Sequence, residues 1–413
     1  MSDVAPRRRT AAAAFVYVTV TLDVLAVGVV GPVWPGLVKS FLGGDTTRAA
    51  AWFGVFATVF AMIQFVCSPL LGALSDRFGR RPIILASNFG LAVDYLVMAL
   101  APSLPWLFVG RIVAGITSAG NSTAYAYIAD VTPPEERAGA FGMIGAAFGL
   151  GFILGPTLGG LLGQVDPRLP FWVAGALSLL NGLYGLLVLP ESLPKSSRAS
   201  FQLRRANPVG ALVLLRSHRQ LLGLAGVNVL AQLAHHVFTT VWVLYVADRY
   251  GWSPLWVGGS MAVVGLSSSV VSAAVVRPMA VRFGERATLL AGLFFGGLGM
   301  AIFGAAGQGW VFLAGIPVMC LWGLANPSIQ GLMTRRVGPS EQGRLQGANA
   351  SLQSLAGLFG PGLFSAVFTF ALTRRDPGME GLPFFLASAF LLSAMAVAWV
   401  VTSARSAAAQ PAA

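Results

Sequence analysis

Three charged residues lie within long apolar stretches of the chain, where a charge is costly. Asp23 and Asp94 are the two acidic residues well inside such stretches, and Arg111 is the one cation at similar depth. A carboxylate in apolar surroundings resists ionisation, so it can take up and release a proton near neutral pH. Charges buried in this way inside a membrane are rare and usually serve a function. The three residues therefore predict a proton-coupling site.

The positions of Asp94 and Arg111 suggest that they are neighbours. Asp94 precedes Pro102 by eight residues, and Arg111 follows Pro105 by six. In a helical hairpin that turns at these prolines, both lie about 10 Å from the turn. The pair could serve only to orient the two helices, or Arg111 could approach and leave Asp94 and so switch its proton affinity. Asp23 has no cation nearby in the sequence and is the better candidate for binding a proton or a cation.

A short, strongly basic loop separates two of the apolar stretches. Residues 72–82 read Gly-Ala-Leu-Ser-Asp-Arg-Phe-Gly-Arg-Arg-Pro. So many charges require water, and short arginine-rich loops lie on the cytoplasmic side of a membrane. The glycines allow tight turns or close backbone approach. The candidate residues of this loop are Gly72, Asp76, Arg77, Gly79, Arg80 and Arg81.

Composition indicates an integral membrane protein. Hydrophobic residues make up 56% of the 413 residues, charged residues make up 10%, and the mean hydropathy is +0.74. Soluble domains carry about 25% charged residues. The net charge of +12 is spread between apolar segments, which favours contact with anionic lipid over nucleic acid. With two cysteines, three histidines and no phosphate-binding or hydrolase motif, we expect no metal site, no cofactor and no enzyme activity.

The fold class predicted is an all-α integral membrane protein with twelve transmembrane helices in two pseudo-symmetric six-helix bundles. Lysine and arginine concentrate in alternate connections, which places both termini in the cytoplasm. The predicted divisions are an N-terminal bundle at 1–190, a cytoplasmic linker at 191–219, a C-terminal bundle at 220–402 and a disordered tail at 403–413. The expected helices cover residues 11–30, 49–74, 83–101, 106–128, 138–163, 171–189, 221–246, 256–276, 287–306, 310–333, 345–372 and 383–401.

The two halves repeat one another at an offset of 205 residues. Arg77-Phe78-Gly79 returns as Arg282-Phe283-Gly284, and Gly155-Pro156 returns as Gly360-Pro361. Such parallel repeats are typical of transporters with a central site between the halves. The second basic loop is degenerate, because Arg277 and Val281 stand where the first has Gly72 and Asp76.

The loop at 72–82 resembles the signature loop between helices 2 and 3 of the major facilitator superfamily. The resemblance implies that its Asp and Arg residues form a charge-relay latch with neighbouring helix ends and that this latch holds the outward-facing state. The simpler interpretation is a generic basic loop. A glycine-rich stretch resembles the helix 5 signature of drug/H+ antiporters, where small residues permit close helix packing and a proline adds a bend. Its residues are Gly151, Gly155, Pro156 and Gly159.

The resemblance extends to the tetracycline/H+ antiporter group. It rests on residues 75–82, on Asp94-Tyr95-Leu96, on Gly110-Arg111, on Phe148-Gly149-Leu150-Gly151 and on Gly251-Trp252. It implies a monomer in the bacterial inner membrane that exports small amphiphilic drugs such as tetracycline-like compounds by alternating access. The proton gradient would drive export without a cofactor. The group's helix 9 aspartate corresponds to Gly296 here, and its helix 8 histidine corresponds to Ser268.

Polar and aromatic residues of the cavity-lining helices of this fold are candidates for substrate binding. Each could instead be a helix-to-helix hydrogen-bonding or packing residue. A proton symporter or a lysolipid exporter on the same fold is an alternative, and a non-transporting receptor is less well supported because the chain has intramembrane carboxylates and a latch-like loop. The candidates are Gln64, Asn121, Tyr125, Asn228, Gln232, His236, Trp242, Asn326 and Gln330.

Overall fold

The computed structural model describes residues 6–117, 120–133, 137–198, 219–337, 342–374 and 378–403. Every regular element in these ranges is helical, which confirms the predicted fold class. Most of the predicted linker and nearly all of the predicted tail lie outside the described residues. The principal helices are α1 (Pro6–Val30), α2 (Trp34–Ser40), α3 (Thr46–Phe78), α4 (Arg80–Leu100), α5 (Leu104–Thr117), α6 (Gly120–Val131), α7 (Arg137–Val165), α8 (Leu169–Val188), α10 (Arg219–Thr240), α11 (Trp242–Tyr250), α12 (Pro254–Val270), α13 (Val276–Ala305), α14 (Gly309–Cys320), α15 (Ala325–Thr334), α16 (Gln342–Arg374) and α17 (Leu382–Val401).

Ten helical segments of the described chain are long and apolar enough to cross a membrane. One of them, Pro254–Ala305, has 52 residues. At 1.5 Å per residue it is long enough for two crossings of a hydrocarbon core of about 30 Å. It bends at Gly284, whose φ of 80° is a conformation that favours glycine. The shorter apolar helix Leu104–Thr117, followed by α6, covers the one remaining predicted segment.

Three predicted helices are interrupted in ways that apolar patterning did not reveal. The segment expected at 221–246 is divided into α10 and α11 at Val241, which has a φ of −109°. A π-helical turn at Val271–Val275 follows α12. A 3-10 turn at Leu321–Leu324 separates α14 from α15. Such irregular turns within long helices often mark functional sites.

The chain forms two compact units, and each is described by itself. The first unit comprises Met1–Gly44, Val59–Ala206 and Trp252–Gly265. The second comprises Asp45–Thr58, Asn207–Gly251 and Leu266–Ala413. The predicted bundles were continuous in sequence, whereas the units take the first part of α3 and most of α12 from the opposite half. These two segments occupy equivalent places in the repeat of 205 residues, so the exchange follows the internal symmetry.

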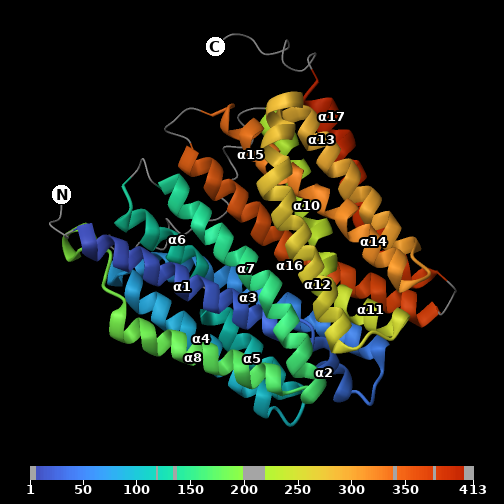
Figure 1. Ribbon diagram of the computed structural model, residues 1–413, viewed down its shortest axis with the longest axis horizontal. Helices are drawn as coiled ribbons and strands as arrows, with labels where there is room; N and C mark the ends of the chain where they lie inside the picture. Colours follow the sequence, from blue (N-terminus) through green and yellow to red (C-terminus); the bar gives the residue numbers. More distant parts are fainter. Residues whose placement is uncertain are drawn as a thin grey trace. The chain divides into compact units, whose positions relative to one another are not determined.

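In the first unit, α1 packs along α7 and α8, while α4 packs against α8 and α5 (Figure 1). Glycines allow the closest approach between α1 and α7. A Cβ atom added to Gly155 would lie 2.7 Å from the Cα atom of Gly28, and one added to Gly151 would lie 2.7 Å from a methyl group of Val24. One added to Gly159 would meet the carbonyl oxygen of Val29. The small residues of the α7 motif therefore hold α1, which carries Asp23.

We expect Gly155→Leu to abolish most transport by separating α1 from α7. A leucine side chain has no room beside Gly28, and overpacking of this kind costs about 1–3 kcal/mol or more. The measurement is substrate efflux at matched membrane expression, together with thermal unfolding in detergent. Gly145→Leu is the matched control, because a Cβ atom there on the same helix meets nothing within 4 Å. Wild-type efflux by Gly155→Leu would contradict the assigned contact.

In the second unit, α10 packs against α16 and α17, and α13 packs against α17 and α14 (Figure 1). Buried aromatic rings fill the space around Trp242, whose ring centroid lies 4.7 Å from that of Phe312 and 5.3 Å from that of Phe303. The start of α3 also belongs to this unit. There the Ser365 hydroxyl donates a 2.5 Å hydrogen bond to the Ala50 carbonyl oxygen, beside Gly54, where an added Cβ atom would meet Ser365.

Candidate functional site

Asp23 is buried between α1 and α8, with 9% of its surface exposed. One carboxylate oxygen, Oδ1, accepts a 2.9 Å hydrogen bond from the Asn181 side-chain amide. The same amide nitrogen donates to the Thr19 carbonyl oxygen at 3.1 Å. Among the ion pairs formed by the described residues, none involves Asp23. The carboxylate is therefore oriented by a neutral amide rather than neutralised by a cation, which suits a group that must gain and lose a proton.

Asp94 and Arg111 form an ion pair across the α4–α5 hairpin. The Asp94 side chain is fully buried, and the Arg111 side chain is 12% exposed. The Arg111 guanidinium lies 4.5 Å from the ring centroid of Trp34 and 5.7 Å from that of Phe60. Aromatic faces attract a cation, so these rings help to hold Arg111 in an apolar setting. Within the described residues the second oxygen, Asp94 Oδ1, has no hydrogen-bond partner.

The two acidic residues lie within one continuous set of helices in the first unit. Helix α1 packs on α8, α8 packs on α4, and α4 packs on α5. Tyr95 adjoins Asp94 in the chain and lies within electrostatic range of Asp23. Asp23 and Asp94 are therefore two buried carboxylates within one packed group of helices.

The basic loop forms a compact charge network at the start of α4. Arg80 donates from Nη1 to Asp76 at 2.5 Å and from Nε to Asp130, at the end of α6, at 3.1 Å. Glu191 accepts hydrogen bonds from the backbone N–H groups of Arg80 and Arg81 at 2.8 and 3.3 Å. Carboxylates are stabilised at a helix N-terminus, where backbone N–H groups lack partners within the helix. The network joins the ends of α3, α4, α6 and α8.

Gly79 lets the chain fit under Glu191. Its φ is 111°, a value that L side chains rarely adopt, and an added Cβ atom would meet the Glu191 carboxylate. The other residues of the loop have different surroundings. The Arg81 guanidinium donates to the Leu186 carbonyl oxygen at 2.7 Å, and the Arg77 guanidinium lies 5.1 Å from the ring centroid of Phe78. At Gly72 an added Cβ atom would meet nothing within 4 Å.

We expect Asp76→Asn to leave the protein folded but to reduce transport severely. The Asp76 side chain is 51% exposed, so the loss of its ion pair costs at most about 1 kcal/mol of stability. Its removal leaves the Arg80 side chain with the Asp130 carboxylate and the Ser75 hydroxyl as acceptors and so changes a network that would have to rearrange between conformational states. Drug resistance in cells with equal amounts of protein is the measurement. Asp166→Asn, an exposed aspartate at the far end of α7, is the control; normal resistance in Asp76→Asn would contradict a gating role.

The predicted substrate-binding residues are distributed over both units. In the first, Gln64 on α3 is half-buried and Tyr125 on α6 is exposed; the side chain of Asn121 lies outside the described part of the structure. In the second, α10 carries the buried Asn228 and the half-buried Gln232. Their assignment to substrate binding stays a prediction.

The remaining candidates belong to the second unit and differ in their surroundings. His236 on α10 lies against Gly360 of α16, where an added Cβ atom would meet its imidazole ring. On α15, Asn326 is exposed and Gln330 accepts a 3.2 Å hydrogen bond from the Asn349 amide. Trp242 is only 2% exposed and lies inside the aromatic core, so a ligand could reach it only after the core opens.

Gly296 and Ser268, which stand where the tetracycline/H+ antiporter group has an aspartate and a histidine, both lie in the second unit. A Cβ atom at Gly296 would lie 2.9 Å from the Cβ atom of Trp322 and 3.2 Å from a methyl group of Leu391. An aspartate does not fit there without displacing Trp322. Ser268 donates a hydrogen bond to the sulfur of Cys320 at 3.4 Å. Both positions are therefore part of helix packing in this unit.

Three residues of these sites were not identified from the sequence. Asn181 is one of several polar residues in apolar helices, and Asp130 and Glu191 appear as ordinary charges at helix ends. Each becomes significant only through a contact made across 50 or more positions of the chain. Their position in the sequence was the available signal. All three lie within or at the end of an apolar segment, and neighbouring segments carry Asp23 or the basic loop.

Comparisons with known proteins show to which family the chain belongs. Residues 12–361 match the family model described as Major Facilitator Superfamily. The class C tetracycline resistance protein of Escherichia coli is 40% identical over 350 residues, which are 85% of this chain and 88% of that protein. The class G protein of Vibrio anguillarum is 37% identical, with coverage of 85% and 88%.

Solved structures have a similar fold. The human organic anion transporter MFSD10 aligns with a TM-score of 0.69 and 25% identity, covering 96% of this chain and 100% of that chain. The nucleoside transporter NupG aligns with a TM-score of 0.75 and 13% identity, covering 94% and 98%. The second similarity concerns the fold alone.

Proposed function

We propose that this chain, which belongs to the Major Facilitator Superfamily, couples proton entry to the export of small amphiphilic drugs such as tetracycline-like compounds. The observation that carries the proposal is the environment of Asp23. A buried carboxylate that has a neutral amide partner and forms no ion pair among the described residues is equipped to bind a proton within the membrane. The identity of 40% to a tetracycline resistance protein supports the proposed substrate class.

We assign each step of the proposed transport cycle to side chains of the first unit. Asp23 binds the proton, and the Asp94–Arg111 pair changes its contacts as the helices move. The network of Asp76, Arg80 and Asp130 holds one state until the cycle proceeds. Energy comes from the proton gradient, so no cofactor is required and no covalent step occurs. The transporter works as a monomer in the bacterial inner membrane with both termini in the cytoplasm.

The polar residues predicted from the lining helices remain the candidates for substrate binding. A molecule with an aromatic, partly polar surface suits side chains such as Gln64, Tyr125, Asn228, Gln232 and Gln330. Because Gly296 leaves no room for a carboxylate, we expect recognition to depend less on a metal chelate than in relatives that have an aspartate there.

Everted membrane vesicles provide the test. Vesicles with an imposed proton gradient and a pH-sensitive dye are given tetracycline with and without Mg²⁺, followed by a panel of amphiphilic cations. Export by antiport releases protons from the vesicle lumen when a substrate is added. No substrate-dependent proton release, relative to vesicles without the protein, would overturn the proposal. Proton movement in the same direction as the substrate would favour the symporter alternative, and export of lysolipids alone would favour the lysolipid exporter.

A further inference from the structure

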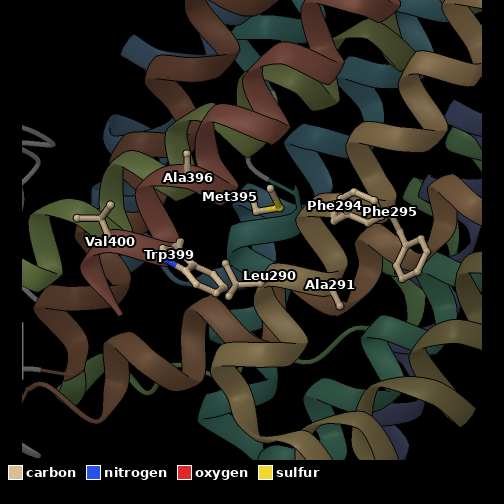
Figure 2. Close-up of a pocket in the computed structure, with 8 residues that line it drawn as sticks. All are labelled: Leu290, Ala291, Phe294, Phe295, Met395, Ala396, Trp399 and Val400. Carbon is tan, nitrogen blue, oxygen red and sulfur yellow. The ribbon is translucent and has the colours of Figure 1, made fainter. Parts of the chain in front are cut away.

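An apolar groove opens on the surface of the second unit between α13 and α17. Its volume is about 630 Å³, and all of its lining side chains are apolar (Figure 2). Leu290 and Phe294 of α13 face Met395, Ala396 and Trp399 of α17 across it. Phe294 is 45% exposed and Trp399 is 60% exposed. In a membrane-spanning helix pair, such a groove is open to lipid tails and offers nothing to a polar ligand.

One end of the groove carries a cation. Arg286 lies one helical turn before Leu290, and its guanidinium is 4.9 Å from the ring centroid of Trp399. Its Nε atom donates a 3.1 Å hydrogen bond to the hydroxyl of Thr402, just after α17. In the described part of the chain, no ion pair or hydrogen bond engages its two Nη atoms. A guanidinium presents these N–H groups as a fork that fits two phosphate oxygens.

The groups along the groove follow the same order as the headgroup and the acyl chains of a phospholipid. A charged fork at the helix ends is followed by a tryptophan, a residue that favours the interface between headgroups and tails. The apolar slot then continues for one to two turns toward the membrane interior. The neighbouring acid, Glu285, is already paired with Arg335 at 2.9 Å, so it does not neutralise Arg286.

We propose that this groove binds one anionic phospholipid, with an acyl chain between α13 and α17 and the phosphate on Arg286. The apolar lining selects a lipid tail, and the unpaired positive fork selects a headgroup with net negative charge. The residues that line the groove include none of those predicted to bind the drug substrate.

Native mass spectrometry of the full-length protein in detergent tests the site. Phosphatidylglycerol and phosphatidylethanolamine with identical acyl chains are added at equal concentrations. We expect one phosphatidylglycerol to bind about fivefold more tightly than phosphatidylethanolamine, as one arginine near the headgroup implies. Arg286→Gln should remove this preference while both lipids still bind. Ala396→Phe, which fills the slot, should weaken the binding of both.

Two matched variants separate the site from general effects. Arg277→Gln removes an exposed arginine before the Gly284 bend, and Ala389→Phe adds the same ring to an exposed position of α17 two turns from Ala396. Both should bind lipid as the wild type does, and thermal unfolding should show that all four variants are folded. An unchanged preference in Arg286→Gln would overturn the proposal, as would equal binding by Ala396→Phe and Ala389→Phe. A dimer that Ala396→Phe dissociates would assign the groove to a second copy instead.

Discussion

Asp23→Asn is expected to abolish proton-driven export while leaving part of the substrate binding intact. Asparagine has nearly the same shape as aspartic acid and can still accept the hydrogen bond from Asn181 through its amide oxygen. The packing between α1 and α8 is therefore preserved. What disappears is the only group at this position that can take up and release a proton, so the effect should fall on coupling rather than on folding.

Two measurements distinguish coupling from binding. Substrate-induced proton release in everted vesicles should drop to the level of vesicles without the protein, whereas binding of a fluorescent substrate to purified protein should remain detectable. Asp45→Asn is the matched control, because Asp45 is exposed and caps the start of α3 by accepting a hydrogen bond from the Arg48 N–H group. Asparagine caps a helix about as well as aspartate. Full proton-coupled activity in Asp23→Asn would remove Asp23 from the mechanism.

Local features of the sequence predicted much of the fold. Apolar length located the membrane segments, because a segment must match the thickness of the hydrocarbon core. The constant helical rise placed Asp94 and Arg111 at one depth, and the structure joins them in an ion pair. The repeat of 205 residues also has a structural counterpart, since the segments exchanged between the two units are equivalent under it.

The contacts that complete the sites could not be predicted in the same way. Asn181 lies 158 positions from Asp23, and Glu191 lies 111 positions from Arg80. The position of a residue along its helix indicates its depth in the membrane, but it does not determine the direction in which the side chain points. That direction depends on which helices are neighbours, and hence on close approaches such as that between Gly28 and Gly155. The interruption at Val241 could not be located from hydropathy, because residues 221–246 contain no proline and no Asp, Glu, Lys or Arg that would mark a break.

The Asp94–Arg111 pair leads to an expected asymmetry between its two single variants. Asp94→Asn leaves the Arg111 guanidinium charged, and loss of one partner of a buried pair costs about 3–5 kcal/mol. Arg111→Gln leaves Asp94 without its cation, but a carboxylate can become neutral by binding a proton, whereas a guanidinium stays charged. Arg111→Gln should therefore express and fold better than Asp94→Asn.

The double variant Asp94→Asn, Arg111→Gln should recover part of the transport lost in Asp94→Asn. With both charges removed, no uncompensated ion remains in the apolar hairpin, and the glutamine amide can still hydrogen-bond to asparagine. Thermal unfolding and efflux are measured at matched expression for the two single variants and the double variant. Glu380→Gln is the control, because its pair with Arg249 at 2.5 Å is partly exposed and should contribute about 1 kcal/mol or less.

The outcome separates two roles for the ion pair. If the pair only orients α4 and α5, the double variant should regain both stability and efflux, because a neutral hydrogen-bonded pair serves that purpose. If the pair also switches during transport, stability should return while the pH dependence of efflux stays altered, since no charge remains to respond to Asp23. A double variant no better than Asp94→Asn in either measurement would show that the two residues act independently, and the pairing argument would fail while the proton role of Asp23 would stand.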